Sequence, residues 1–326
     1  MSKALSLIEG FSEKRVLLLG DTILDIYVYG QAIGKSAETP TIVAKEIETK
    51  FSLGGAFLVA RNLLELGAQV TFLTMVGDDP EADYVRSFKH ERLKKFLILD
   101  PRRRTTTKKR YWVDGYKLLQ FDTLDNSPIG QDLKDAVTSQ MRRLLPDQDA
   151  VVVADYRHGL LSPPLIKEVL KLVREAGKCL YVDSQTSQSA ANHLLYFGAD
   201  VICLNLKEAR AIDPQFEPGY ELSCLAQLTG KLGTTQVIVK LGEEGCVAAI
   251  REQLYHSKAL KVSALDTCGA GDAFLAALSL SGLECPAEAL AIANAWAGLS
   301  TQTHGAHPPS RRDLLRVISS SESTSS

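Results

Sequence analysis

The chain has 326 residues, of which 45% are hydrophobic and 23% are charged, so it can bury a large core as one α/β domain or two smaller ones. Its formal net charge of −2 argues against nucleic acid or an anionic membrane as the main partner. The six cysteines form no C-x-x-C pair and no apolar run approaches the roughly 18 residues of a membrane span, so we expect a cytoplasmic protein with reduced thiols.

Apolar strands and helices alternate along most of the chain. The first strand is a run at residues 16–19 that ends in Gly20-Asp21, which is typical of a buried parallel strand whose carboxyl end opens a binding site. The further predicted elements are strands at 70–77, 96–99, 150–155, 179–183, 200–204 and 236–240, a helix at 56–66, and helices centred near residues 138, 170, 192 and 227. This alternation predicts an α/β fold with a mainly parallel sheet and helices on both faces. Two or three more helices are expected after residue 272.

Two interruptions predict a small second sheet. Segments 26–30 and 41–47 favour strands but are too polar for the centre of a parallel sheet, so we predict an antiparallel flap. A hairpin over residues 111–122 turns at Asp114-Gly115 and completes it. The predicted organisation is one domain over residues 1–318, with lid strands inserted at about 26–51 and 105–122. The serine-rich residues 319–326 predict a disordered tail.

A turn of small residues directly before a helix start is the most informative stretch. It is the string DTCGAGD at residues 266–272. The backbone N–H groups of Gly269, Ala270 and Gly271 are expected to bind a phosphate there, since a helix N-terminus attracts anions. Asp272 is suited to accept the proton of an attacking hydroxyl, and the positive helix end is expected to keep it ionised. The alternative is a plain helix N-cap after a glycine turn.

The string at 266–272 matches the D-T-x-G-A-G-D signature of the ribokinase-like (phosphofructokinase B) sugar kinases, and the chain resembles that family along its whole length. Gly54 and Gly55 match the family's sugar-site glycines, and the N-x-x-E motif and a glycine turn follow in family order at 205–208 and 241–245. The resemblance implies a three-layer ribokinase-like sandwich with a small β-sheet lid. It also implies ATP and Mg²⁺ as cofactors, and we consider a monovalent cation as a further one.

Within that family the chain most resembles the bacterial heptose 7-phosphate kinases. The matching segments are residues 20–25 (GDTILD), 36–40 (SAETP), 106–110 (TTKKR) and 154–159 (ADYRHG). A nucleotidyltransferase domain follows in many of these relatives, and we expect only the kinase part here. The resemblance implies phosphoryl transfer from ATP to a phosphorylated sugar.

The ATP side of the site is expected to come from the second half of the chain. Asn205 and Glu208 are predicted to hold Mg²⁺ through water, although the same spacing is typical of a helix capping box. Gly242 and Gly245 are expected to shape the wall against the ribose and phosphates, or only to turn a hairpin. Asn294 matches a family helix beside the adenine pocket, or it is a buried hydrogen-bonded amide.

The acceptor side is expected to come from strand ends and a basic run. Asp25 and Asp155 are predicted to bind sugar hydroxyls, although either is also a common turn residue. Six cations lie between residues 102 and 110, and Lys108 and Arg110 alternate onto one face of a strand. Both can therefore point into the cleft, where they suit an acceptor that carries phosphate. For residues 102–104 the alternative is a charged, protected edge strand.

Two departures from the family pattern leave the acceptor open. Leu58 stands where the family usually has an asparagine that contacts the sugar, and residues 183–186 read DSQT where heptose kinases carry D-P-K-G. A site that lacks one hydrogen-bonding group discriminates against the original substrate, because a hydroxyl is left unpaired. A kinase for another sugar or a nucleoside, and a non-catalytic sugar-phosphate or nucleotide sensor, therefore stay as alternatives. The open edge of the flap also suggests a homodimer.

Overall fold

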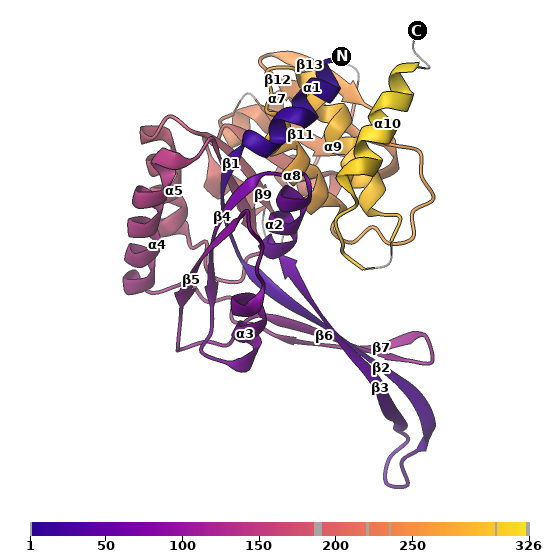
Figure 1. Ribbon diagram of the computed structural model, residues 1–326. Coiled ribbons are helices and arrows are strands. Elements are labelled where there is room, and N and C mark those ends of the chain that lie inside the picture. Colours follow the sequence, from indigo (N-terminus) through magenta and orange to yellow (C-terminus); the bar gives the residue numbers. More distant parts are fainter. Residues whose placement is uncertain (1, 186–190, 220–221, 235, 304, 324–326) are drawn as a thin grey trace.

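The computed structural model describes the chain except residues 1, 186–190, 220–221, 235, 304 and 324–326, and its main element is a nine-stranded sheet (Figure 1). The strand order is β13-β12-β11-β10-β9-β8-β1-β4-β5. The strands are β1 (Arg15–Gly20), β4 (Gln69–Val76), β5 (Leu93–Leu99), β8 (Ala150–Asp155), β9 (Cys179–Ser184), β10 (Val201–Asn205), β11 (Val237–Lys240), β12 (Cys246–Ile250) and β13 (Gln253–Ser257). Only the β11–β12 and β12–β13 pairs of this sheet are antiparallel. The predicted mainly parallel sheet is confirmed.

Helices cover both faces of this sheet. Alternate residues of β1 point to opposite sides, Val16 and Leu18 into one apolar cluster and Leu17 and Leu19 into the other. The first face is covered by α1 (Lys3–Gly10), α2 (Ala56–Glu65), α3 (Pro80–Ser87), α8 (Ala270–Ser281), α9 (Pro286–Ser300) and α10 (Arg311–Ser323). The second is covered by α4 (Gln131–Leu144), α5 (Pro163–Glu175), α6 (Leu206–Ile212) and α7 (Ser223–Leu232). This three-layer arrangement confirms the predicted fold class.

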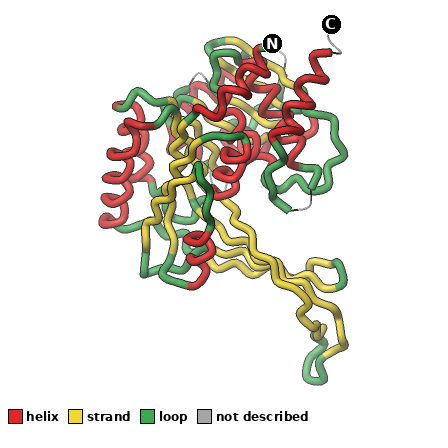
Figure 2. The backbone as a smooth tube through the Cα atoms, in the orientation of Figure 1, coloured by secondary structure: helices red, strands yellow, loops and turns green. Residues whose placement is uncertain are grey.

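A separate four-stranded sheet, called the small sheet below, projects from the main body (Figures 1 and 2). Its order is β3 (Ile42–Gly55), β2 (Thr22–Lys35), β6 (Thr107–Val113), β7 (Tyr116–Thr123). The β2–β3 and β6–β7 pairs are antiparallel, which confirms the predicted antiparallel flap and hairpin, and the parallel β2–β6 pair joins the two. In the chain, β2 follows β1 and β6 follows β5. Because β1 and β5 are parallel strands of the main sheet, the chain leaves both at the same edge of that sheet, and β2 and β6 run in the same direction.

Three local predictions differ from the structure. The helix expected near residue 192 is a short 3₁₀ helix, Asn192–Tyr196, and residues just before it lie outside the described chain. Helices α1 and α6 were not predicted. Helix α10 continues to Ser323, so residues 319–323 are helical rather than disordered, and the rest of that tail lies outside the described residues. The hydroxyls of Ser319 and Ser320 donate to the carbonyls four residues earlier, as serines inside a helix can, and Ile318 of the same helix is buried.

Among the described residues, none of the helices combines the length and the apolar composition that are needed to cross a lipid bilayer.

Candidate active site

A cavity of about 160 Å³ lies where the carboxyl ends of the central strands meet the N-terminus of α8. This is the edge at which open α/β sheets bind ligands. The residues that line it are Ala154, Asp155, Tyr156, Asp183, Gln185, Asn205, Glu208, Lys240, Gly269, Gly271 and Asp272. The structure therefore brings the DTCGAGD turn together with the N-x-x-E motif and two strand ends that are far apart in the sequence.

The DTCGAGD turn leads directly into α8, as predicted. Gly269 precedes the helix with a left-handed φ of 85°, and a Cβ atom there would lie 2.6 Å from Leu58 Cδ2, so only glycine fits. The Asp266 carboxylate accepts from the backbone N–H groups of Cys268 (2.9 Å) and Gly305 (3.1 Å) and holds the turn in place. The N–H of Ala270 donates to Thr267 O at 3.3 Å, so it is already engaged.

The same turn leaves two donors for an anion. Within the described part of the chain, the N–H groups of Gly269 and Gly271 have no acceptor. They stand at the positive end of α8. Two of the three predicted phosphate-binding amides are thus available.

Asp272 lies on the cavity wall, where the Tyr156 hydroxyl donates a hydrogen bond to its carboxylate. Desolvation in this enclosed position raises the pKa of Asp272 to about 7, and the nearby carboxylates of Asp183 and Asp25 also raise it. The Tyr156 hydrogen bond and the Lys240 ammonium act in the opposite direction. Burial thus opposes the predicted ionisation of this carboxylate, and its ionisation at the helix end stays a prediction.

Tyr156 is a site residue that the sequence analysis did not single out. Its backbone N–H donates to the buried Asp21 carboxylate at 3.0 Å, and the N–H of His158 donates to the same oxygen at 3.3 Å. Asp21, in the GDTILD segment, thereby fixes the loop after β8 that carries Tyr156. The position of a tyrosine directly after a strand-end aspartate was the available signal.

Asp25 and Arg110, at the predicted acceptor end of the site, form an ion pair. The Arg110 Nη1 atom lies 2.6 Å from Asp25 Oδ1, and both side chains are mostly buried. Lys108 pairs with Asp25 in the β2–β6 register, so Lys108 and Arg110 share a face as predicted. Burial raises the pKa of Asp25, and the ion pair with Arg110 opposes that change. Arg110 is therefore already partnered within the chain, which the sequence did not indicate.

Gly54 and Gly55 make room for this acceptor end. A Cβ atom at Gly54 would lie 2.2 Å from Asp25 Oδ2, so the carboxylate occupies space that any other residue would fill. Gly55 has a φ of 59°, and a Cβ atom there would lie 2.5 Å from the carbonyl oxygen of Asp21. The two glycines set the path of the chain between the small sheet and α2.

Asp155 is buried and already has several donors in the chain. One carboxylate oxygen accepts from the backbone N–H of Arg157 at 2.9 Å. The other accepts from the Ser184 hydroxyl and the Tyr196 hydroxyl, both at 2.9 Å, and from the Asn192 amide. Contact between Asp155 and a sugar stays a prediction, and the structure shows that this carboxylate joins β8, β9 and the 3₁₀ helix below the cavity.

Asn205 and Glu208 form a reciprocal capping box at the start of α6. Asn205 Oδ1 accepts from the Glu208 N–H at 2.9 Å, and Glu208 Oε2 accepts from the Asn205 N–H at 2.7 Å. The alternative structural role is therefore present. Both residues also line the cavity, and their amide and carboxylate oxygens are of the kind that Mg²⁺ prefers as ligands. These oxygens fit the predicted role of holding hydrated Mg²⁺, which stays a prediction.

The other predicted nucleotide-binding residues lie outside this cavity. Gly245 has a φ of 96° and turns β11 into β12, where a Cβ atom would lie 2.0 Å from Ser257 O. Gly242, with a φ of 65°, begins the 3₁₀ turn Gly242–Glu244. Asn294 of α9 donates to the Ser257 carbonyl at 3.0 Å and is buried. Their structural roles are thus visible, and their contacts with a nucleotide stay predictions.

The first part of the basic run is neutralised within the chain. Arg103 is buried against Asp100, with 2.7 Å between its Nε atom and the carboxylate. Arg102 pairs with Asp100 and Asp132, and Arg104 pairs with Glu81. Residues 102–104 lie in a turn and loop before β6, so the alternative of an edge strand is wrong, and their charges are paired within the chain.

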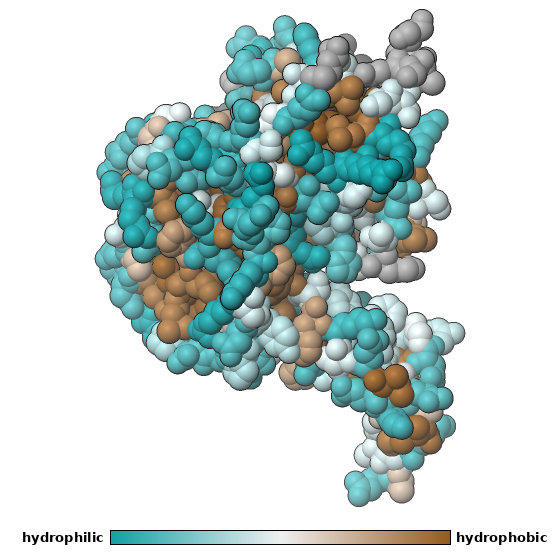
Figure 3. Space-filling view, in the orientation of Figure 1, coloured by the Kyte–Doolittle hydropathy of each residue, from teal (hydrophilic) through white to brown (hydrophobic). Residues whose placement is uncertain are grey.

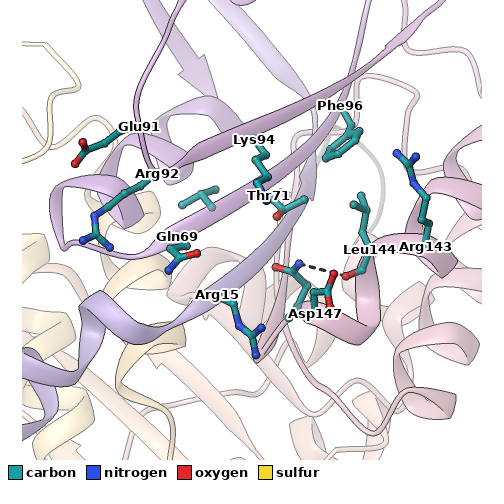
Figure 4. Close-up of a pocket in the computed structure, with 12 residues that line it drawn as sticks. Arg15, Gln69, Thr71, Glu91, Arg92, Lys94, Phe96, Arg143, Leu144 and Asp147 are labelled. Atoms are coloured by element: carbon teal, nitrogen blue, oxygen red, sulfur yellow. Dashed lines mark hydrogen bonds between the residues drawn. The ribbon is translucent and has the colours of Figure 1, made fainter.

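A larger cavity lies at the opposite edge of the main sheet (Figure 4). Its volume is about 920 Å³, and it opens between the amino ends of β1 and β4, strand β5 and the end of α4. The Arg143 guanidinium lies over the Phe96 ring there, 5.5 Å from its centroid. This cavity contains none of the predicted site residues.

Comparison with known proteins identifies the family of the chain. The profile of the family described as "pfkB family carbohydrate kinase" matches residues 13–312. The protein named "Bifunctional protein HldE" from Paramagnetospirillum magneticum is 32% identical over 311 residues, which cover 92% of this chain and 62% of that protein. Its namesake from Caulobacter vibrioides is 32% identical over 96% of this chain and 65% of its own length. The chain thus spans less than two thirds of these curated relatives.

Solved structures show the same fold. Phosphofructokinase-2 from Escherichia coli in complex with potassium superimposes with a TM-score of 0.74 at 17% identity, covering 94% of this chain and 98% of that chain. Arabidopsis thaliana ribokinase complexed with ribose and ATP gives a TM-score of 0.70 at 21% identity, with the same coverage. Together with the profile match, these findings confirm the resemblance inferred from the DTCGAGD string: the chain belongs to the pfkB family of carbohydrate kinases.

Proposed function

We propose that this protein transfers the γ-phosphate of ATP to the anomeric hydroxyl of a heptose 7-phosphate. The observation that carries the proposal is the position of Asp272, which lies on the wall of a cavity between the free amides at the start of α8 and the Asn205–Glu208 pair. A carboxylate beside an anion-binding helix end is the arrangement that phosphoryl transfer to a hydroxyl requires.

The chemistry follows from positioning more than from covalent catalysis. The acceptor oxygen attacks the γ-phosphorus, the bond from that phosphorus to the bridging oxygen breaks, and ADP leaves. The acceptor proton passes to Asp272, whose pKa of about 7 suits a base that works near neutral pH. The N–H groups of Gly269 and Gly271 stabilise the charge on the transferred group. Bound Mg²⁺, held through water by Asn205 and Glu208, would neutralise phosphate charge.

The proposed acceptor, a heptose 7-phosphate, is supported by the residues of the small sheet and of its junction with the main body. Lys108 and Arg110 present cations beside Asp25, which suits a sugar that carries both hydroxyls and a phosphate. Leu58 favours the alternative acceptors, another sugar or a nucleoside. It is buried against Gly269, where the family's asparagine would contact the sugar.

An acceptor panel in a coupled ADP-release assay tests this proposal. The panel contains heptose 7-phosphates of both anomeric forms, the unphosphorylated heptoses, other sugar phosphates and nucleosides, each with and without Mg²⁺. We expect turnover to be fastest with a heptose 7-phosphate and to be abolished by Asp272→Asn. Turnover with other acceptors only would assign the alternative kinase. Tight binding of sugar phosphate and ATP without Asp272-dependent turnover would assign a sensor.

We also propose a cytoplasmic homodimer that forms through the small sheet. Exposed apolar side chains gather on this projecting sheet (Figure 3). They include Ile33, Ile47, Tyr116 and Phe121, each at least 62% exposed. Apolar side chains exposed on a sheet with open edges are costly for a monomer and favour a partner.

A further inference from the structure

Lys240 is a mostly buried cation that the phosphoryl-transfer mechanism above does not use. Its side chain is 16% exposed, and its ammonium forms an ion pair with the Asp183 carboxylate. Of the described residues that line the cavity, Lys240 is the one with a positively charged side chain. The carboxylates of Asp183, Glu208 and Asp272 line the same cavity.

The strand register places this ammonium at the start of α8. Lys240 is opposite Asn205 on β10, whereas Asp183 on β9 is opposite Cys203. The lysine side chain therefore extends from β11 across the end of β10 to β9. There a Cβ atom built on Gly271 would lie 3.3 Å from Lys240 Nζ, so the ammonium lies against the phosphate-binding turn.

Although burial opposes it, the Asp183 and Glu208 carboxylates raise the pKa of Lys240, so its side chain carries a positive charge beside the start of α8. A helix N-terminus carries partial positive charge and repels a cation, and removing an ammonium from water is costly even with one carboxylate partner. The ammonium and the Gly269 and Gly271 amides instead converge on one region, which an anion would satisfy.

We propose that Lys240 binds the γ-phosphoryl group of ATP during its transfer, and that Asp183 holds the ammonium in place. The proposal rests on the proposed kinase reaction but not on the identity of the acceptor. As the acceptor oxygen bonds to the γ-phosphorus and the bond to the ADP oxygen breaks, the ammonium donates to a non-bridging oxygen of the moving group. The acceptor proton still passes to Asp272, and Lys240 keeps its own protons throughout.

The central experiment compares Lys240→Met with the double variant Lys240→Met/Asp183→Asn. Methionine keeps the length of the side chain and removes its charge. We expect kcat to fall about a hundredfold in Lys240→Met, in line with the loss of one charge-stabilising donor, while KM for the acceptor changes little. The double variant removes the uncompensated carboxylate, so it restores the melting temperature without restoring kcat. Recovery of kcat in the double variant, or a kcat within threefold of wild type in Lys240→Met, would overturn the proposal.

The control is Lys231→Met, which removes a lysine of α7 that pairs with Asp213 at 3.5 Å, away from the cavity. We expect it to leave kcat unchanged.

Nucleotide binding gives a readout that does not depend on the acceptor. We expect the wild-type protein to bind a non-hydrolysable ATP analogue more tightly than ADP, and Lys240→Met to lose at least tenfold of that preference. An unchanged preference would overturn the role of Lys240 even if no acceptor were turned over. Conversely, a lost preference with no turnover of any heptose would refute the acceptor assignment alone.

The pH profile gives a further test. Asp272 is faced by Tyr156 from the loop after β8, Asp183 from β9, Lys240 from β11 and Asp25 from β2. Because the ammonium lowers the pKa of Asp272, its removal raises that pKa. We expect the acidic limb of the kcat/KM profile to move to higher pH in Lys240→Met and to stay in place in Lys231→Met. A limb that does not move would contradict the placement of the ammonium beside Asp272.

Discussion

At the scale of single residues, the site depends on buried charges whose neighbours set their protonation. Asp272 is the proposed base, and the Tyr156 hydroxyl and the Lys240 ammonium limit the rise in its pKa that burial causes. Asp25 faces a similar balance with Arg110. The groups that lower the pKa of these carboxylates are far from them in the sequence. Substitution of such a group should therefore change the pKa, and with it the reaction, while the carboxylate itself stays in place.

Asp272→Asn tests the base directly. The amide keeps the shape of the side chain but cannot accept the acceptor proton, so we expect kcat to fall about a thousandfold while ATP binding stays near wild type. Steady-state kinetics and isothermal titration with an ATP analogue measure the two effects. Activity near wild type would remove Asp272 from its proposed role.

Tyr156→Phe tests the tuning of that base. The hydroxyl stabilises the ionised carboxylate, so its loss raises the pKa of Asp272 from about 7. We expect the acidic limb of kcat/KM to move to higher pH, so the loss of activity is greatest below neutral pH. Tyr255→Phe is the matched control, because that hydroxyl donates to Gln253 on β13, outside the cavity. Equal profiles for the two variants would mean that Tyr156 has no such effect.

At the scale of elements, strand ends and helix starts bring the chemistry together. The carboxyl ends of β8, β9, β10 and β11 lie beside one another because the strands are parallel, and α6 and α8 begin at the same edge. The small sheet reaches that edge through β2 and β6. Its junction with the main body depends on the space that Gly54 leaves for Asp25.

Gly54→Ala tests this junction. The added Cβ atom would lie 2.2 Å from Asp25 Oδ2, so the carboxylate must move and its contact with Arg110 must change. We expect KM for the sugar to rise at least tenfold while KM for ATP changes little. Gly230→Ala, on α7 with no neighbour within 4 Å of the new atom, is the control and should leave both constants unchanged. A similar rise in both constants would indicate general disruption instead.

Asn205→Ala separates the cap from the proposed metal role. Loss of the capping hydrogen bond should lower the free energy of unfolding by about 1 kcal/mol. If Asn205 also holds hydrated Mg²⁺, the concentration of Mg²⁺ for half-maximal activity should rise severalfold. Asn205→Ser retains a helix cap but shortens the side chain, so it should restore stability without restoring the Mg²⁺ dependence. Recovery of both would leave the cap as the sole role.

At the scale of the whole molecule, the main body and the projecting small sheet divide the work. In the proposed function, the body would provide the phosphate-binding turn and the base beside the capping box, and the small sheet would provide the acceptor-side cations. The exposed apolar side chains of that sheet have no cover within the described chain. An association of two copies through this surface would shield them.

Phe121→Glu tests that association. Phe121 is 64% exposed on β7, so the change should not disturb the core of the monomer. We expect sedimentation to show a dimer for wild type and a monomer for the variant, with an unchanged melting temperature of the main body. Glu252→Lys, an exposed charge reversal in the turn between β12 and β13, should leave the dimer intact. A wild-type monomer at micromolar concentration would refute the proposal.

Sequence patterns alone predict the layered α/β fold, the small second sheet and the glycine turn before α8. These features depend on local patterns: apolar runs of strand length, polar strands between them, and a glycine turn directly before a helix. The string DTCGAGD also indicated the family, because its seven consecutive residues match the D-T-x-G-A-G-D signature.

Which charges meet follows from tertiary packing. The sequence placed Asp272 at a helix end and predicted an ionised carboxylate, but burial and the proximity of Asp183 and Asp25 raise its pKa. Lys240, the cation at the end of an apolar strand, became a site residue only when β11 was placed two strands from β9. Coulomb energies and desolvation depend on distances between strands that are remote in the chain, and those distances are set by packing rather than by sequence spacing.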